Sequence, residues 1–148
     1  MTLGGNDVMK VVKSDLFSLK KEMFDKELMH FAQRYRDIIA EIRIRNSEAP
    51  ILLIGFYNPF SIITDEYTPF EAIVNEWNDT IQQIATDDSN ACFVPISDLF
   101  VTNAGMVYHT DFFHPSASGY EQMTERIIEY MKLCDIEEMS EGRIGIEE

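Results

Sequence analysis

Two short, uninterrupted apolar runs constrain the fold of this chain more than any other feature. Residues 50–55 (PILLIG) and 91–96 (ACFVPI) lack the polar alternation of a half-exposed strand, and turn residues bound them. Continuous apolar runs of this length are typical of strands buried on both faces of a parallel sheet. The sequence therefore predicts two central strands with helices on either side.

Three longer segments carry apolar residues three and four apart with charges between them, over residues 20–45, 69–86 and 116–133. This spacing is typical of amphipathic helices, and Pro69 suits a first helical turn. The last helix begins either at the capping-box pair Ser118 and Glu121 or earlier, at Pro115 or Ser116. The alternation of helices and strands predicts α/β architecture with parallel strands.

The first residues read as the end of a third strand, because Met1-Thr2-Leu3 leads directly into Gly4-Gly5-Asn6-Asp7. Doubly wound sheets have about five strands or more, so three strands indicate part of a larger domain. We expect a three-layer α/β/α, flavodoxin-like fold with a parallel sheet that is truncated at its amino-terminal end. Residues 1–133 would form the carboxyl-terminal portion of one domain, and residues 134–148 a solvated acidic tail.

The charge balance excludes several classes of partner. Twelve Lys and Arg against 26 Asp and Glu give a formal net charge of −14. Such a chain repels phosphate backbones and anionic lipid, so we expect no nucleic-acid partner. The longest apolar run, residues 51–56, is far shorter than the roughly 20 residues that span a bilayer. With no signal peptide at Met1, the expected location is cytoplasmic, and an upstream segment that exports or anchors the complete protein stays possible.

The cysteines and the loop motifs predict no cofactor. Cys92 and Cys134 are too few for a disulfide framework, and we expect two free thiols. The sequence contains no zinc-finger spacing, no glycine-rich phosphate loop and no dinucleotide fingerprint.

The sharpest candidate for chemistry is the segment from Asp111 to Pro115, which precedes the last helix. The imidazole of His114 can act as a general base near neutral pH if an acceptor fixes its tautomer, and Asp111 lies three residues before it. This is the base and orienter of a hydrolytic triad. A plain surface turn and a metal site of His109, Asp111 and His114 are the alternatives.

The second candidate is the glycine-rich turn that follows the first residues. Glycines let backbone N–H groups approach a ligand, so Gly5 and the Asn6 amide are candidate donors to an oxyanion. The alternative is an ordinary turn that ends a strand.

Taken in order, the two segments resemble the SGNH (GDSL-type) hydrolases, in their bacterial lipase/acylhydrolase branch. Gly4-Gly5-Asn6-Asp7 is similar to the third block of this family, G-x-N-D, whose Asn donates to the oxyanion hole. The segment 111–115 (DFFHP) is similar to the fifth block, D-x-x-H, which holds the base His and its Asp. The resemblance covers roughly residues 1–133 and extends to residues 55–60 (GFYNPF), 77–78 (WN) and 94–100 (VPISDLF).

The resemblance implies hydrolysis of a small-molecule carboxylic ester by a Ser-His-Asp mechanism. The family's first block, G-D-S with the nucleophilic Ser, is absent, as is the second block with its oxyanion Gly; both would lie upstream of Met1. Ser97 follows the wrong strand, and Ser14 and Ser18 fall in a helical stretch. We expect little turnover from this chain alone. The alternative is a naturally truncated, non-catalytic protein that acts by binding or self-assembly, and an exposed strand edge favours a homo-oligomer.

Overall fold

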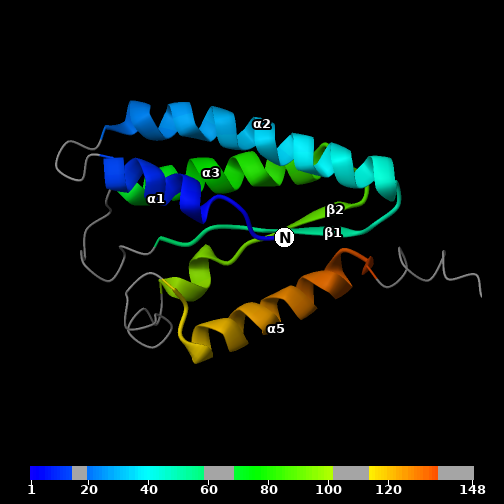
Figure 1. Ribbon diagram of the computed structural model, residues 1–148. Coiled ribbons are helices and arrows are strands. Elements are labelled where there is room, and N and C mark those ends of the chain that lie inside the picture. Colours follow the sequence, from blue (N-terminus) through cyan, green and yellow to red (C-terminus); the bar gives the residue numbers. More distant parts are fainter. Residues whose placement is uncertain (15–19, 59–68, 102–113, 137–148) are drawn as a thin grey trace, which may run out of the picture.

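The computed structural model describes residues 1–14, 20–58, 69–101 and 114–136 of the 148. In these ranges four α-helices, two strands and one 3-10 helix follow each other along the chain (Figure 1). They are α1 (Gly5–Ser14), α2 (Lys21–Arg45), β1 (Ile51–Ile54), α3 (Pro69–Thr86), β2 (Ala91–Val94), the 3-10 helix η1 (Ser97–Phe100) and α5 (Ala117–Leu133).

The two strands pair in parallel, as the sequence predicts. Ile51 lies opposite Ala91, and the register continues to Ile54 opposite Val94. On the other side of β1, the Met1 amino group donates to the Leu52 carbonyl, and the Ile54 amide donates to the Met1 carbonyl at 2.9 Å. These two bonds have the pattern of a parallel pair, so residues 1–3 extend the sheet by a short third segment.

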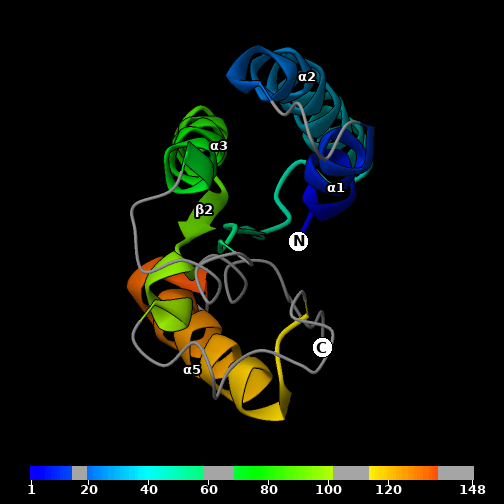
Figure 2. The same cartoon turned by 90° about the vertical axis from the view of Figure 1, so that its left-hand side faces the viewer.

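Helices cover both faces of this sheet (Figure 2), which confirms the three-layer prediction. Helices α1, α2 and α3 lie on one side, and α5 lies on the other. Alternate side chains of β1 enter the two layers: Ile51 and Leu53 join the core under α2 and α3, whereas Leu52 and Ile54 pack with α5. The strands are therefore buried from both sides.

The core beneath α2 and α3 is built largely from aromatic rings. Phe31 and Tyr35 of α2 and Trp77 of α3 are each 2% exposed or less. The Phe31 and Trp77 rings stack with centroids 4.8 Å apart. Helix α3 has the predicted bounds, and α2 begins one residue later than predicted because Lys20 is its extended N-cap.

Helix α1 is a feature that the sequence interpretation did not separate from the glycine-rich turn. Gly4 has φ +102°, and its carbonyl accepts hydrogen bonds from the amides of Asp7 and Val8 at 2.9 and 3.0 Å. The turn thus passes directly into a helix whose Val11 and Val12 are buried. The helical stretch expected at Ser14 is the end of this helix, and its start at Gly5 was not predicted because glycine is a weak helix signal.

The expectation of two free thiols is wrong. Cys92 of β2 and Cys134, the C-cap of α5, form a disulfide with Cα atoms 6.3 Å apart. Cys92 lies opposite Leu52, which packs toward α5, so its side chain is on the same face of the sheet as that helix. Counting cysteines does not reveal this proximity, since the two lie 42 positions apart in the sequence. The helix begins after the N-cap Ser116, which is the earlier of the two predicted starts.

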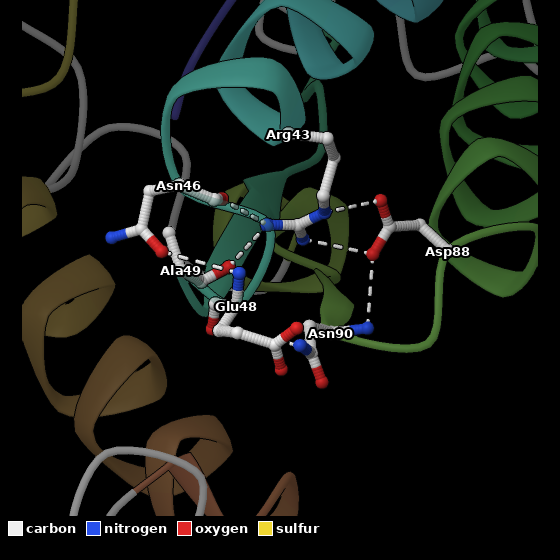
Figure 3. Close-up of polar contacts among 6 residues, drawn as sticks. All are labelled: Arg43, Asn46, Glu48, Ala49, Asp88 and Asn90. Carbon is white, nitrogen blue, oxygen red and sulfur yellow. Dashed lines mark hydrogen bonds and ion pairs between the residues drawn. The ribbon is translucent and has the colours of Figure 1, made fainter. Parts of the chain in front are cut away.

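At the amino ends of the strands, a polar cluster joins the loops that precede them (Figure 3). The guanidinium of Arg43, in the last turn of α2, lies between Asp88 on one side and the carbonyls of Asn46 and Ala49 on the other. Asp88 in turn accepts from the amide of Asn90 at 2.9 Å. This cluster fixes the entry of both strands into the sheet.

Candidate active site

A cavity of about 480 Å³ lies where the parallel strands end. Its walls include Gly5 and Asn6 after the first segment, Gly55 and Phe56 after β1, and His114 before α5. Candidate residues from opposite ends of the sequence therefore meet at one cavity. Carboxyl ends of the strands are the usual position of sites in open α/β sheets.

In the glycine-rich turn at this cavity, neighbouring aromatic rings leave no room for a side chain at Gly4. A Cβ on Gly4 would lie 2.2 Å from Cζ of Phe56 and 2.7 Å from Cε2 of Phe31, and its positive φ also favours glycine. Gly5 has no atom within 4 Å of such a Cβ. The chain thus reaches α1 with the Gly5 backbone partly exposed and the Asn6 side chain at the cavity rim.

The segment after β1 is held by a side chain of α3. The Phe56 amide donates to Oδ1 of Asn78 at 2.6 Å, and Nδ2 of Asn78 donates to the Phe56 carbonyl at 3.1 Å. Asn78 is 9% exposed, and the Phe56 ring packs on Phe31 and Trp77. Phe56, which forms this part of the cavity wall, is therefore held both by its backbone hydrogen bonds to Asn78 and by the packing of its ring.

His114 lies at the entrance to α5. The residue is exposed and lines the cavity, and the next residue, Pro115, is buried. Ser116 then caps the helix, because its Oγ accepts from the Gly119 amide at 3.2 Å. A buried proline and a helix cap on its carboxyl side fix the backbone that presents the imidazole. Asp111 and His109 lie outside the described residues.

A charged group flanks the cavity near Asn6. Nη2 of Arg34 lies 2.5 Å from Oδ1 of Asp7 and 3.1 Å from Oε1 of Glu27. Burial raises the pKa of Glu27, but the hydrogen bond from Arg34 and the charges of Lys10 and Arg34 outweigh it and leave the pKa lowered. The carboxylates balance the arginine, so this wall carries little uncompensated charge.

The chemistry that these groups support is proton transfer beside an anion-stabilising turn. An imidazole, a side-chain amide and backbone amides suit an acyl-transfer site. No serine or cysteine lines the cavity among the described residues. In the same part of the chain no cluster of three or more His, Cys, Asp or Glu is placed to hold a metal ion. The alternative metal site includes His109 and Asp111, which lie outside that part.

The sequence analysis places Phe56 and Asn78 in segments that resemble the family, at residues 55–60 and 77–78, but it assigns neither residue a role in this site. A signal exists for Asn78, which is a polar residue beside Trp77 on a helix face that is otherwise apolar. For Phe56 the resembling segment 55–60 is the signal, although an aromatic residue after a strand does not by itself indicate contact with Gly4.

A parallel α/β sheet with a candidate base and oxyanion donors at the strand ends is an arrangement of hydrolytic enzymes. The chain matches the GDSL-like Lipase/Acylhydrolase family over residues 1–122 and belongs to this family. It is 31% identical over 133 residues to the uncharacterized protein YpmR of Bacillus subtilis (strain 168), covering 88% of this chain and 52% of that protein.

The fold also matches a solved structure, the lipase Lip_vut3 from a goat rumen metagenome. The TM-score is 0.75 at 20% identity, over 87% of this chain and 61% of the lipase. The chain thus spans about half the length of the curated relative and less than two thirds of the solved one. Across the described ranges, none of the helices has both the length and the hydropathy to cross a bilayer.

Proposed function

We propose that this chain supplies the base, the orienting acid and part of the oxyanion hole of a carboxylic-ester hydrolase. The observation that carries the proposal is that Gly5, Asn6 and His114 line the same cavity. The nucleophilic serine comes from a segment outside these 148 residues. The family match supports the reaction class, and the chain's coverage of only 52% of its relative leaves room for such a segment.

Each residue has a distinct role in the proposed mechanism. His114 takes the proton of the serine hydroxyl as its oxygen attacks the ester carbonyl, and then gives that proton to the departing alcohol. Asp111 holds the imidazole in the correct tautomer. The Asn6 amide and the Gly5 backbone N–H stabilise the tetrahedral oxyanion. Water then cleaves the acyl-serine bond, with His114 again as base, and regenerates the serine.

The walls of the cavity support an ester with an apolar acyl group. Buried Ile73, Val74 and Trp77 lie along it, whereas the exposed polar residues Asn6 and His114 stand at its rim. An apolar wall with few polar groups is typical of small-molecule sites.

The Cys92–Cys134 disulfide favours an oxidising location for the complete protein over the cytoplasm.

The test begins with the gene upstream of Met1, read in frame. If a G-D-S segment precedes Met1, the extended protein should hydrolyse p-nitrophenyl butyrate, and the 148-residue chain should not. His114→Ala should then lower kcat by at least a thousandfold. The matched control is His30→Ala on the exposed face of α2, which should leave kcat unchanged. His109→Ala distinguishes the metal alternative, since only that mechanism requires His109.

Two results would overturn the proposal. The first is a stop codon directly before Met1, and the second is an extended protein whose esterase activity survives His114→Ala.

A second candidate function, self-association, is favoured by the sheet edge at residues 1–3. Met1 uses its amino group and its carbonyl to bond β1, so Thr2 points its backbone N–H and C=O away from β1. Thr2 is exposed. Such an edge accepts another strand, from a second copy or from the segment that carries the serine.

Light scattering after size exclusion tests this candidate. A dimer that Thr2→Pro converts to a monomer supports edge pairing, because proline removes the outward N–H. A clean monomer in the unmodified chain excludes it.

A further inference from the structure

Asn78 of α3 makes a paired contact with the backbone of one residue in the loop after β1. Its Oδ1 accepts from the Phe56 amide at 2.6 Å, and its Nδ2 donates to the Phe56 carbonyl at 3.1 Å. The side chain is 9% exposed, so water replaces neither bond readily. The fit is close, since a Cβ on Gly55 would lie 2.9 Å from the same Oδ1.

The backbone held by Asn78 carries a ring that presses on the glycine-rich turn. Cζ of Phe56 would lie 2.2 Å from a Cβ on Gly4, closer than any side chain tolerates. The ring is supported from behind by Phe31 and Trp77, with centroids 5.9 and 5.6 Å away. The Phe56 ring therefore lies directly against the Gly4 backbone, in the space that a side chain at this position would need.

Gly4 in turn determines where α1 begins. Its carbonyl accepts from the amides of Asp7 and Val8 at 2.9 and 3.0 Å, and Asn6 lies within this turn. A continuous path of contacts thus runs from Asn78 through Phe56 and Gly4 to Asn6.

We infer that Asn78 is a positioning residue that holds the Gly5–Asn6 turn in register with the cavity. The inference rests on the proposed function for its chemical meaning, since Asn6 is the oxyanion donor there. The structural part of the inference is that a change at Asn78 of α3 alters the conformation of the Gly5–Asn6 turn, and this effect is measurable without any turnover.

The amide is the chemical group that this position requires. The Phe56 amide needs an acceptor and the Phe56 carbonyl needs a donor, and a primary amide supplies both. In an Asn78→Asp variant, the ionised carboxylate offers two acceptors and no donor, so one of its oxygens is set against the Phe56 carbonyl oxygen. The protonated acid supplies one acceptor and one donor again, so acid restores the pattern.

The experiment follows the backbone amide resonances of Gly5 and Asn6 by two-dimensional NMR. In Asn78→Asp these resonances should be displaced from the unmodified protein at pH 7 and return toward it as the carboxyl is protonated. The matched control is Asn90→Asp, at the opposite ends of the strands. At each pH its Gly5 and Asn6 resonances should coincide with those of the unmodified protein at the same pH. Displacement that is absent at pH 7, or that does not reverse in acid, overturns the inference.

Hydrogen exchange in the unmodified protein tests the same coupling and does not depend on how well a variant folds. The amides of Phe56, Asp7 and Val8 should be released by one opening event, with equal protection and equal dependence on denaturant. Independent exchange of Phe56 overturns the inference.

Turnover in the extended protein separates this inference from the proposed function. Asn78→Asp should lower kcat at least tenfold at pH 7 with KM within about twofold, because the oxyanion donor acts in the transition state. If the NMR coupling is found in a protein with no esterase activity, the proposed function fails and the coupling stands. If esterase activity is found with kcat unchanged in Asn78→Asp, the positioning role fails alone.

Discussion

The guanidinium of Arg43 and the carboxylate of Asp88 meet end to end, with Nε–Oδ2 and Nη2–Oδ1 distances of 2.8 Å each. Nη1 of Arg43 also donates to the Ala49 carbonyl at 2.7 Å. Both side chains are largely buried, at 19% and 14% exposed. The pair joins the end of α2 to the loop before β2 (Figure 3). These are the amino ends of the strands, whereas the candidate active site lies at their carboxyl ends.

This pair predicts a specific dependence of stability on pH. The hydrogen bond from Arg43 lowers the pKa of Asp88. A folded-state pKa below the unfolded value stabilises the protein above about pH 4, and this stabilisation is lost as the pH falls through the folded pKa. Asp88→Asn should lower the free energy of unfolding at pH 7 by about 2–3 kcal/mol and flatten its decline in acid. Urea unfolding between pH 7 and pH 3 measures both effects.

The control for Asp88 is Asp25→Asn, which breaks the exposed pair with Lys21. Exposed pairs contribute little, so this change should cost about 0.5 kcal/mol or less. Equal losses in the two variants would contradict the structural role of the Arg43–Asp88 pair.

The two glycines of the turn should respond in opposite ways to alanine. Gly4→Ala places a Cβ against Phe56 at positive φ, so we expect a loss of about 3 kcal/mol or more in stability. Gly5→Ala meets no atom within 4 Å and should leave stability unchanged or raise it by about 0.5 kcal/mol. Thermal and urea unfolding of the two variants side by side measure the contrast, and similar values for both would show that Phe56 does not confine Gly4.

The disulfide should contribute to stability because it ties the end of α5 to β2, and the apolar residues by which α5 packs on the sheet (Met123, Ile127 and Tyr130) are only partly buried. Gly119 is the helix's buried residue, and Tyr120, Ile128 and Leu133 are exposed. Closing a loop across a sequence separation of 42 is worth about 4 kcal/mol in the chain-entropy account. We expect a loss of that order when both cysteines are replaced by serine, and no further effect of reductant on the variant. Two titratable thiols in the native, unreduced protein would restore the free-thiol expectation.

The buried phenol of Tyr35 predicts a substitution that does not lower the stability of the protein. Its hydroxyl has no hydrogen-bond partner in the described structure, and burial raises the pKa of the phenol. Tyr35→Phe removes only this oxygen, so stability should stay unchanged or rise by about 1 kcal/mol. Tyr35→Leu removes the ring that packs on Phe31 and should cost about 2–4 kcal/mol. A clear loss in Tyr35→Phe would reveal a bound partner for the hydroxyl.

The layers of this fold are predictable from sequence because their signals are local. Continuous apolar runs predicted strands buried on two sides, and three-four spacing predicted α2, α3 and α5 nearly to the residue. The meeting of Asn6 and His114 at one cavity also follows from sequence, since parallel strands end at the same edge. The Cys92–Cys134 bond does not, because it depends on which face of β2 Cys92 occupies and on where the end of α5 lies against that face.

The shape of the site is the part that sequence reasoning did not reach. The contact of Phe56 with Gly4 joins residues far apart in the chain, and no periodicity encodes it. Asp111 remains a prediction, since it lies outside the described residues.

Trp77 is the single tryptophan of the chain, and it is 1% exposed between the stacked ring of Phe31 and the edge of Phe56. All indole emission of this 148-residue chain therefore comes from one position beneath the cavity, shielded from water. Trp77 is therefore an intrinsic fluorescent probe of the Phe56 loop. Any ligand or partner that moves the Phe56 ring should change the wavelength or the intensity of the Trp77 emission.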